Sequence, residues 1–320
     1  MWPFASAPKF PEGVWYDVPM CIPTWSGLRG GYEFASLTDF VVPAVIIFTV
    51  TTLMRLGTAK LLLIPLANVA SKDVKDRRKF VEAAWRAILY AAACIFAVRC
   101  IFFGNDEMLW LNDSVQFWKG YPFEPTDNIR MLYALYTGFY VHQLIFLFLD
   151  TKSSDFAALL LHHCVTLTIV VLSWTVKQTR IGAFTMVLHD FSDFFLEIAK
   201  CFNYSQKSHP KLSVGADVAF VVFAISFFFL RLYIYPTRVL HSAVVHSCPY
   251  SGCIGARAPD GTWGELIPPT LANCWSAPAF LAFIPALAVL QGLQIFWGWK
   301  VLGVIATVIR GKALEDPRED

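Results

Sequence analysis

Residues 155–205 read DFAALLLHHCVTLTIVVLSWTVKQTRIGAFTMVLHDFSDFFLEIAKCFNYS, two apolar runs that contain ionisable side chains. These side chains are His162, His163, His189, Asp190, Asp193 and Glu197. A charged Asp at the centre of a bilayer costs at least ~2.5 kcal/mol, so a membrane segment that keeps several is expected to use them. This cluster is the candidate functional site.

The composition places the whole chain in a membrane. Of its 320 residues, 56% are hydrophobic and only 16% are charged, whereas a soluble domain carries about 25% charged residues. The net charge is only +2, and Lys and Arg gather in one short segment alone. The sequence therefore gives no support for a nucleic-acid partner.

We predict an all-α polytopic membrane protein with about seven transmembrane helices, because seven apolar stretches approach the ~20 residues that cross a ~30 Å core. The expected spans are residues 38–58, 82–103, 131–150, 157–176, 181–201, 216–236 and 278–309. The expected organisation is an N-terminal segment over 1–37, a first span with a basic loop over 38–81, a six-helix domain over 82–310 with a long connection over 237–277, and a tail over 311–320.

The charged connections predict the orientation. Residues 71–80, SKDVKDRRKF, hold five Lys and Arg residues, and short basic loops stay in the cytosol. The N-terminal segment and connection 237–277 are then luminal, and the tail is cytosolic. Asn112, in an Asn-Asp-Ser sequon, is a luminal glycosylation candidate. Four cysteines would face the oxidising side as disulfide candidates, with all three pairings open: Cys21, Cys248, Cys253 and Cys274.

The short connection near residues 177–180 predicts that the fourth and fifth spans form an antiparallel hairpin. With the turn centred near residues 178–179, residue n faces about residue 357 − n on the partner helix, at ~1.5 Å per residue. His163 then lies beside Asp193, and the His pair and the two aspartates share one depth. Adjacent His162 and His163 diverge by about 100°, so only one of them faces any single centre.

Three interpretations of the cluster compete. The side chains could simply hydrogen-bond between helices. They could bind a transition metal, although the contiguous His pair lacks the spacing that suits one ion, and we predict no metal. They could perform acid–base or nucleophilic chemistry, in which a carboxylate orients an imidazole and the bundle excludes water. The third interpretation accounts for the most residues.

The same stretch resembles the signature region of the TLC-domain ceramide synthases. The order and spacing of that signature hold throughout, except that Trp174 stands where Tyr is more usual. The matching residues are His162, His163, Thr166, Ser173, Trp174, Arg180, Gly182, His189, Asp190, Asp193, Glu197, Lys200 and Tyr204. Looser similarity extends over residues 118–310, including YVHQ at 140–143, RLYIYP at 231–236 and FW at 296–297.

The resemblance implies a TLC-type bundle or barrel of six helices around a lipid channel, in the membrane of the endoplasmic reticulum. It implies transfer of a fatty acyl group from acyl-CoA, the co-substrate, to the amine of a sphingoid base, with no further cofactor. A non-catalytic TLC-type protein for lipid binding or trafficking is the alternative, and a metal-dependent lipid oxidase is a more distant one. The acyl length, the sphingoid base and homo- or heterodimer formation stay open.

The roles that the resemblance implies are hypotheses. His162 would accept the acyl group or act as general base, and His163 or His189 would take the proton of the amine. Asp190 and Asp193 would orient and stabilise the imidazolium. We expect substrate contacts, or packing beneath them, from a second set of residues: Ser173, Trp174, Arg231 and Glu197.

Overall fold

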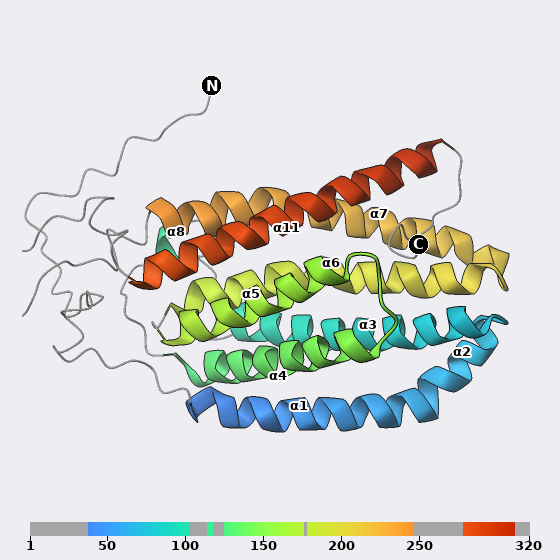
Figure 1. Cartoon of the computed structure of the whole chain (residues 1–320), viewed down its shortest axis with the longest axis horizontal. Helices are drawn as coiled ribbons and strands as arrows, with labels where there is room; N and C mark the ends of the chain where they lie inside the picture. The colour runs from blue at the N-terminus through green and yellow to red at the C-terminus, as the bar shows by residue number, and fades with distance from the viewer. Residues whose placement is uncertain (1–37, 103–113, 118–124, 176–177, 246–277, 311–320) are drawn as a thin grey trace, which may run out of the picture.

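The computed structural model describes residues 38–102, 114–117, 125–175, 178–245 and 278–310, which form a bundle of long helices (Figure 1). The N-terminal segment 1–37, the tail 311–320 and Asn112 lie outside the described residues, as do the four disulfide candidates Cys21, Cys248, Cys253 and Cys274.

All secondary structure of the described residues is helical, in agreement with the all-α polytopic fold that the sequence predicts. The helices are α1 (Thr38–Thr58), η2 (Ala59–Leu63), α2 (Ile64–Ala70), α3 (Val74–Phe102), η4 (Ser114–Phe117), α4 (Asp127–Leu149), α5 (Phe156–Thr175), α6 (Thr179–Gln206), η5 (Pro210–Leu212), α7 (Ser213–Phe227), η6 (Phe228–Leu240), α8 (His241–Val245) and α11 (Pro278–Ile309).

Six helical segments of the described part are long and apolar enough to cross a membrane. They are Thr38–Ala70, Val74–Ile101, Asp127–Leu149, Phe156–Thr175, Pro210–Val244 and Phe283–Ile309. The fifth expected span, α6, is a helix of 28 residues but is not among the six. It differs from the others in carrying the carboxylates of the candidate site together with basic side chains.

The expected basic loop at residues 71–80 is wrong. The first span continues through η2 and α2 to Ala70, and only residues 71–73 separate it from α3. Four of the five basic side chains therefore lie in the first turns of α3, and Lys72 lies in the short connection. The helix begins there because Asp73 caps it: its Oδ1 accepts hydrogen bonds from the backbone N–H groups of Lys75 (2.7 Å) and Asp76 (3.0 Å). These two bonds hold the pKa of the exposed Asp73 carboxyl below its ordinary value.

The expected boundary at residue 236 is also wrong. Helix continues through η6 and α8 to Val245, so the connection expected over 237–277 begins later. Pro236 lies inside the π-helical segment η6, where the wider turn accommodates a residue that would break the bonding of an ordinary α-helix.

Helix α6 occupies the middle of the bundle, where it packs mainly between α3 and α7. Helix α1 packs against α4, and α5 packs against α11 and α4. The contact between α5 and α6 is much smaller than these. The expected tight hairpin of α5 and α6 is therefore not the main packing unit of α6.

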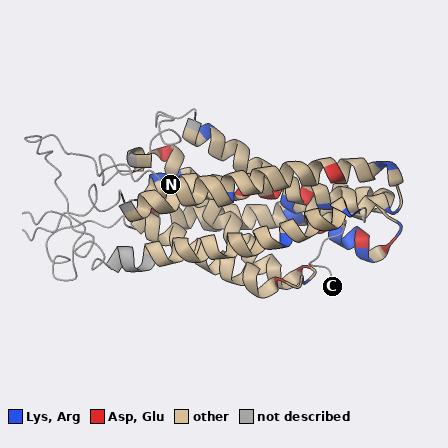
Figure 2. Ribbon diagram, turned by 90° about the horizontal axis from the view of Figure 1, so that it is seen from above, with Lys and Arg blue, Asp and Glu red and all other residues tan. Residues whose placement is uncertain are grey.

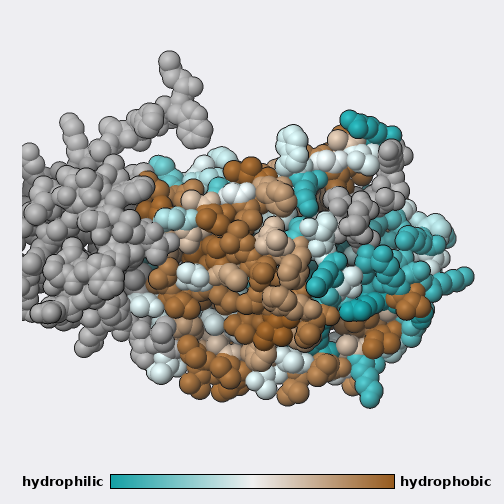
Figure 3. All heavy atoms as spheres, in the orientation of Figure 1, coloured by the Kyte–Doolittle hydropathy of each residue, from teal (hydrophilic) through white to brown (hydrophobic). Residues whose placement is uncertain are grey.

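Charged residues gather toward one end of the bundle (Figure 2). This end, which we call the polar end, holds the connections at residues 71–73, 150–155 and 207–209 (Figure 1). An apolar band covers the middle of the molecule beside it (Figure 3). Such a band is the surface expected of helices that face hydrocarbon.

Candidate active site

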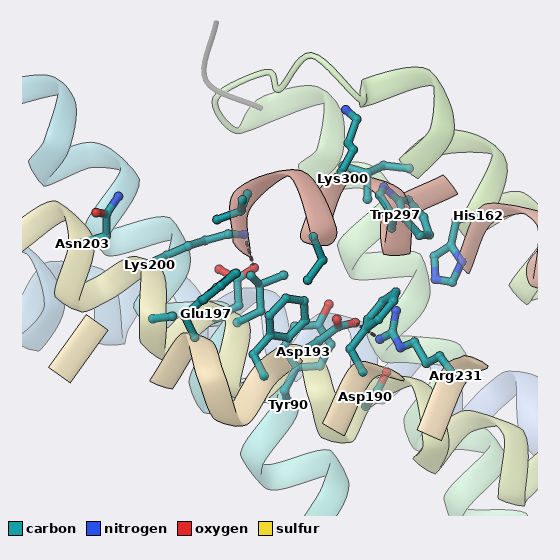
Figure 4. A pocket seen from close by; sticks show the side chains of 18 of the residues that line it. Tyr90, His162, Asp190, Asp193, Glu197, Lys200, Asn203, Arg231, Trp297 and Lys300 are labelled. Atoms are coloured by element: carbon teal, nitrogen blue, oxygen red, sulfur yellow. Dashed lines mark hydrogen bonds and ion pairs between the residues drawn. The ribbon is translucent and has the colours of Figure 1, made fainter. Parts of the chain in front are cut away.

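A partly open cavity lies among α5, α6, α7, η6 and α11, with about 1120 Å³ of space between the atoms, part of which is open to solvent. Its lining is mostly apolar, with Leu196, Phe220, Phe223, Phe227 and Val301 among the residues, and we call it the apolar cavity. The structure brings most of the predicted site residues to this cavity (Figure 4). They are His162, His163, Asp190, Asp193, Glu197 and Arg231.

The two adjacent histidines make different contacts. The His162 ring lies edge-on to Trp297, with centroids 5.5 Å apart, and its centroid is 5.9 Å from that of His189. The His163 ring lies edge-on to Tyr140 at 6.0 Å. Nδ1 of His163 is buried and has no hydrogen-bond partner among the described residues. His163 therefore has one unused hydrogen-bonding position. A buried polar atom without a partner is costly, so such atoms are uncommon in folded proteins.

The register expected for α5 and α6 is wrong. A pairing of residue n with about 357 − n would place His162 beside Phe195, but its ring neighbour on α6 is His189. The physical reason is that α6 follows the surfaces of α3 and α7 and packs little against α5. The two expected groups still meet at one cavity.

The two aspartates do not bond the histidines, contrary to expectation. Asp190 Oδ1 accepts a hydrogen bond from the Tyr140 hydroxyl at 2.9 Å, and its buried Oδ2 has no partner among the described residues. Asp193 Oδ2 pairs with Arg231 Nη2 at 2.7 Å. Both carboxylates are held by neighbouring helices, Asp190 by α4 and Asp193 by η6, which fixes α6 in the bundle.

Ser173 and Trp174 lie away from the cavity, in a contact between α4 and α5. The Ser173 hydroxyl bonds the Tyr133 hydroxyl at 2.9 Å. The Trp174 ring packs on Tyr133 (5.4 Å) and Phe40 (4.8 Å). The structure therefore places these two signature residues in packing, and a substrate contact for either stays a prediction.

A second cavity of about 1050 Å³ extends from the site toward the polar end. Its charged lining comprises five cations, Lys75, Lys79, Arg86, Lys152 and Lys200, and three carboxylates, Glu82, Asp150 and Glu197. We call it the polar cavity. It shares lining residues with the apolar cavity, namely Tyr90, Leu159, His163, Glu197 and Lys200. The two cavities therefore meet at His163.

An ion-pair network lies at this junction and continues along the polar cavity. Glu197 pairs with Lys200 at 2.6 Å (Figure 4). It also pairs with Arg86 Nε at 3.2 Å. Arg86 also lies 3.5 Å from Asp150, which pairs with Arg55 at 2.5 Å. The network joins α1, α3, α6 and the end of α4.

The site includes residues to which the sequence analysis gave no role. Arg86 lies within an apolar span, and an intramembrane charge is itself a signal of a site. Tyr140 and Trp297 stand in two of the segments with looser family resemblance. Gln294, whose side chain bonds His189, follows an apolar run without any motif, so no sequence signal indicates it. Among the described residues, no group of three His, Cys, Asp or Glu side chains is arranged to hold a metal ion; the predicted absence of a metal stays a prediction.

The fold and the site define a class: helical integral membrane proteins with a histidine–carboxylate cluster at a partly open, largely apolar cavity. Comparison with known proteins narrows that class. A family model described as the TLC domain matches residues 79–303. Ceramide synthase LOH1 of Arabidopsis thaliana is 31% identical over 78% of this chain and 77% of its own length. Ceramide synthase hyl-1 of Caenorhabditis elegans is 33% identical over 78% of this chain and 62% of its own length.

The chain belongs to the TLC-domain family, in its ceramide synthase group. Ceramide synthase 4 of Bos taurus is 30% identical over 76% of this chain, but the match covers 54% of that relative. The chain thus spans about half the length of some of the curated relatives that it matches.

Proposed function

We propose that the protein is a ceramide synthase that transfers a fatty acyl group from acyl-CoA to the amine of a sphingoid base such as dihydrosphingosine. One observation carries this proposal: a histidine pair lies where an apolar cavity meets a polar cavity with excess positive charge. In acyl-CoA the thioester carbon joins an apolar acyl chain to an anionic CoA group, so its binding site needs an apolar and a cationic region side by side.

The two cavities suit the two halves of acyl-CoA. Phenylalanines and aliphatic residues of the apolar cavity suit an alkyl chain, whose burial contributes about 0.8 kcal/mol per CH₂. In the polar cavity, the cationic side chains of Lys75 and Lys152 are placed to bind phosphates. The thioester would then lie at the junction, beside His162 and His163.

The proposed chemistry uses the His pair. A ring nitrogen of His162 attacks the thioester carbon, a C–N bond forms, and the C–S bond breaks to release the CoA thiolate. The amine then attacks the acyl carbon, the electron pair of the broken C–N bond returns to His162, and the proton that the amine loses passes through a neighbouring histidine to the CoA thiolate or to solvent. An enclosed site protects the acyl-imidazole from water. In the alternative scheme, His162 acts only as general base for direct transfer.

The proposed location is the membrane of the endoplasmic reticulum, with the polar end and the C-terminus in the cytosol. The first turns of α3 carry Lys75, Arg77, Arg78 and Lys79 at this end, and clustered basic residues favour the cytosolic side. Acyl-CoA would approach the polar cavity from there.

The test is mass spectrometry of lipid products after purified protein meets mixed-length acyl-CoAs and dihydrosphingosine. We expect dihydroceramide from the wild type and from Cys164→Ala, a matched control in α5 whose side chain is exposed, and none from His162→Ala. An acyl adduct on wild-type protein quenched with acyl-CoA alone would support the covalent scheme. Folded wild-type protein without product would favour a lipid-binding role.

A further inference from the structure

His189 has both ring nitrogens engaged. Its Nδ1 lies 2.7 Å from the backbone carbonyl of Thr185, one turn earlier in α6. A carbonyl oxygen can only accept, so Nδ1 carries a hydrogen and donates it. Nε2 lies 2.5 Å from the side-chain nitrogen of Gln294, on α11. An amide nitrogen can only donate, so Nε2 is the acceptor. The two bonds define one neutral tautomer, with its hydrogen on Nδ1.

The surroundings of His189 favour this neutral ring. Arg231 donates to the backbone carbonyl of His189 and pairs with Asp193, so a guanidinium cation already lies against this turn of α6. The His189 ring also lies edge-on to Tyr235, with centroids 5.4 Å apart, and its centroid is 5.9 Å from that of His162. A second positive charge here would lie among groups that offer it no carboxylate contact.

His163 differs from His189 in both respects. Its Nδ1 has no hydrogen-bond partner among the described residues, and its side chain lines the apolar and the polar cavity alike. Because Nδ1 is buried, the ring nitrogen that can receive a proton from a group in either cavity is Nε2. His189 could receive a proton on Nε2 only after the hydrogen bond from Gln294 to that nitrogen had broken.

We propose that His189, held in its neutral tautomer by Gln294, is a positioning residue for His162, and that His163, through Nε2, accepts the proton of the attacking amine. This inference rests on the proposed function and decides between the two bases that the sequence left open. In the transfer step, the amine nitrogen forms the amide bond, its proton passes to His163, and the acyl group leaves His162. His163 then returns the proton to the thiolate or to solvent.

The first test needs no activity. Protein with ¹⁵N-labelled histidine in lipid nanodiscs should give one pair of ring ¹⁵N signals typical of a neutral imidazole protonated on Nδ1. The pair is assigned to His189 by its loss in His189→Gln. In Gln294→Met, which keeps the length of the side chain but cannot donate, the Nε2 signal should shift. Gln291→Met is the matched control on α11 and should leave the signal unchanged. A His189 ring protonated on Nε2, or on both nitrogens, would overturn the assignment.

The second test separates the two half-reactions. With acyl-CoA alone, His163→Phe should still form the acyl adduct, but on adding dihydrosphingosine it should release at least ~100-fold less amide per second, within the range for a lost general base. His189→Gln, which keeps an acceptor for Gln294, should retain both half-reactions within about tenfold. Loss of transfer in His189→Gln together with normal transfer in His163→Phe would overturn the proposal. If the wild type forms neither adduct nor amide, the proposed function fails, while the tautomer result stands by itself.

Discussion

Gly182 of α6 lies against Tyr133 of α4 and Ser173 of α5, and replacing it tests how tightly the bundle positions the site. A Cβ atom at this position would lie 2.0 Å from the Tyr133 hydroxyl oxygen and 2.8 Å from Ser173 Oγ. Those two hydroxyls bond each other, and both residues are fully buried. Gly182→Ala must therefore break their hydrogen bond or displace α6.

The cost follows from the two effects. Overpacking a core costs about 1–3 kcal/mol and a lost hydrogen bond about 1 kcal/mol, together about 2–4 kcal/mol. At about 2 °C per kcal/mol, the midpoint of thermal unfolding should fall by about 4–8 °C. Product formation should fall as well, because His189 lies two turns further along the displaced helix.

The assay is thermal unfolding of detergent-purified protein, followed by tryptophan fluorescence. Gly292→Ala is the matched control, since a Cβ there would meet no atom within 4 Å. Alanine in place of a helical glycine stabilises by about 0.5–1 kcal/mol, so this control should unfold at the same temperature as the wild type or slightly higher. Equal unfolding temperatures for the two variants would refute the tight packing inferred at Gly182.

Three further predictions concern charge and orientation. Arg231→Met leaves the Asp193 carboxylate without its ion-pair partner, which should cost about 3–5 kcal/mol of stability; the double variant with Asp193→Asn should recover most of it in the same unfolding assay, and no recovery would contradict the pairing. If the N-terminus is luminal, Asn112 carries a glycan, and endoglycosidase should change the gel mobility of the wild type but not of Asn112→Gln; an unmodified wild type in microsomes would argue for the opposite orientation. The lowered pKa of Asp73 means that its ionised cap stabilises α3 above the ordinary pKa of 3.8 and that this contribution is lost as the pH falls through the lowered value. The protection factor of the amides at the start of α3, which corrects the exchange rate for its intrinsic pH dependence, should fall on acidification in the wild type and much less in Asp73→Asn, which keeps a capping oxygen; an equal fall in both would exclude the cap.

Much of the fold could be predicted because hydrophobic runs of about 20 residues have few alternatives to membrane helices. The limits of the first span could not, because the basic residues after Ala70 are compatible with either a loop or a helix. The cap at Asp73 decided for the helix. The candidate site was predictable as a set, since charges in apolar runs are few.

The partners within the site were not predictable. Proximity in sequence suggested that the aspartates orient the histidines. In the folded bundle Asp190 instead accepts a hydrogen bond from Tyr140, and Asp193 pairs with Arg231. Pairing of α5 with α6 assumed that sequential helices pack best against each other. Here the stronger contacts of α6 are with helices that come earlier and later in the chain, which no local pattern records.

The central position of α6 has a consequence for the biosynthesis of the protein. This helix is the long one least suited to partition into lipid by itself, and its partners are made at different times. Tyr140 and Arg86 leave the ribosome before α6, whereas Arg231 and Gln294 leave it afterwards. A nascent chain that ends after α6 would hold Asp193 without its counter-ion and His189 without its amide partner. We therefore expect α6 to be stably integrated only after the last helix has docked. The contacts that position the candidate site thus also make the completion of synthesis a condition for stable membrane integration.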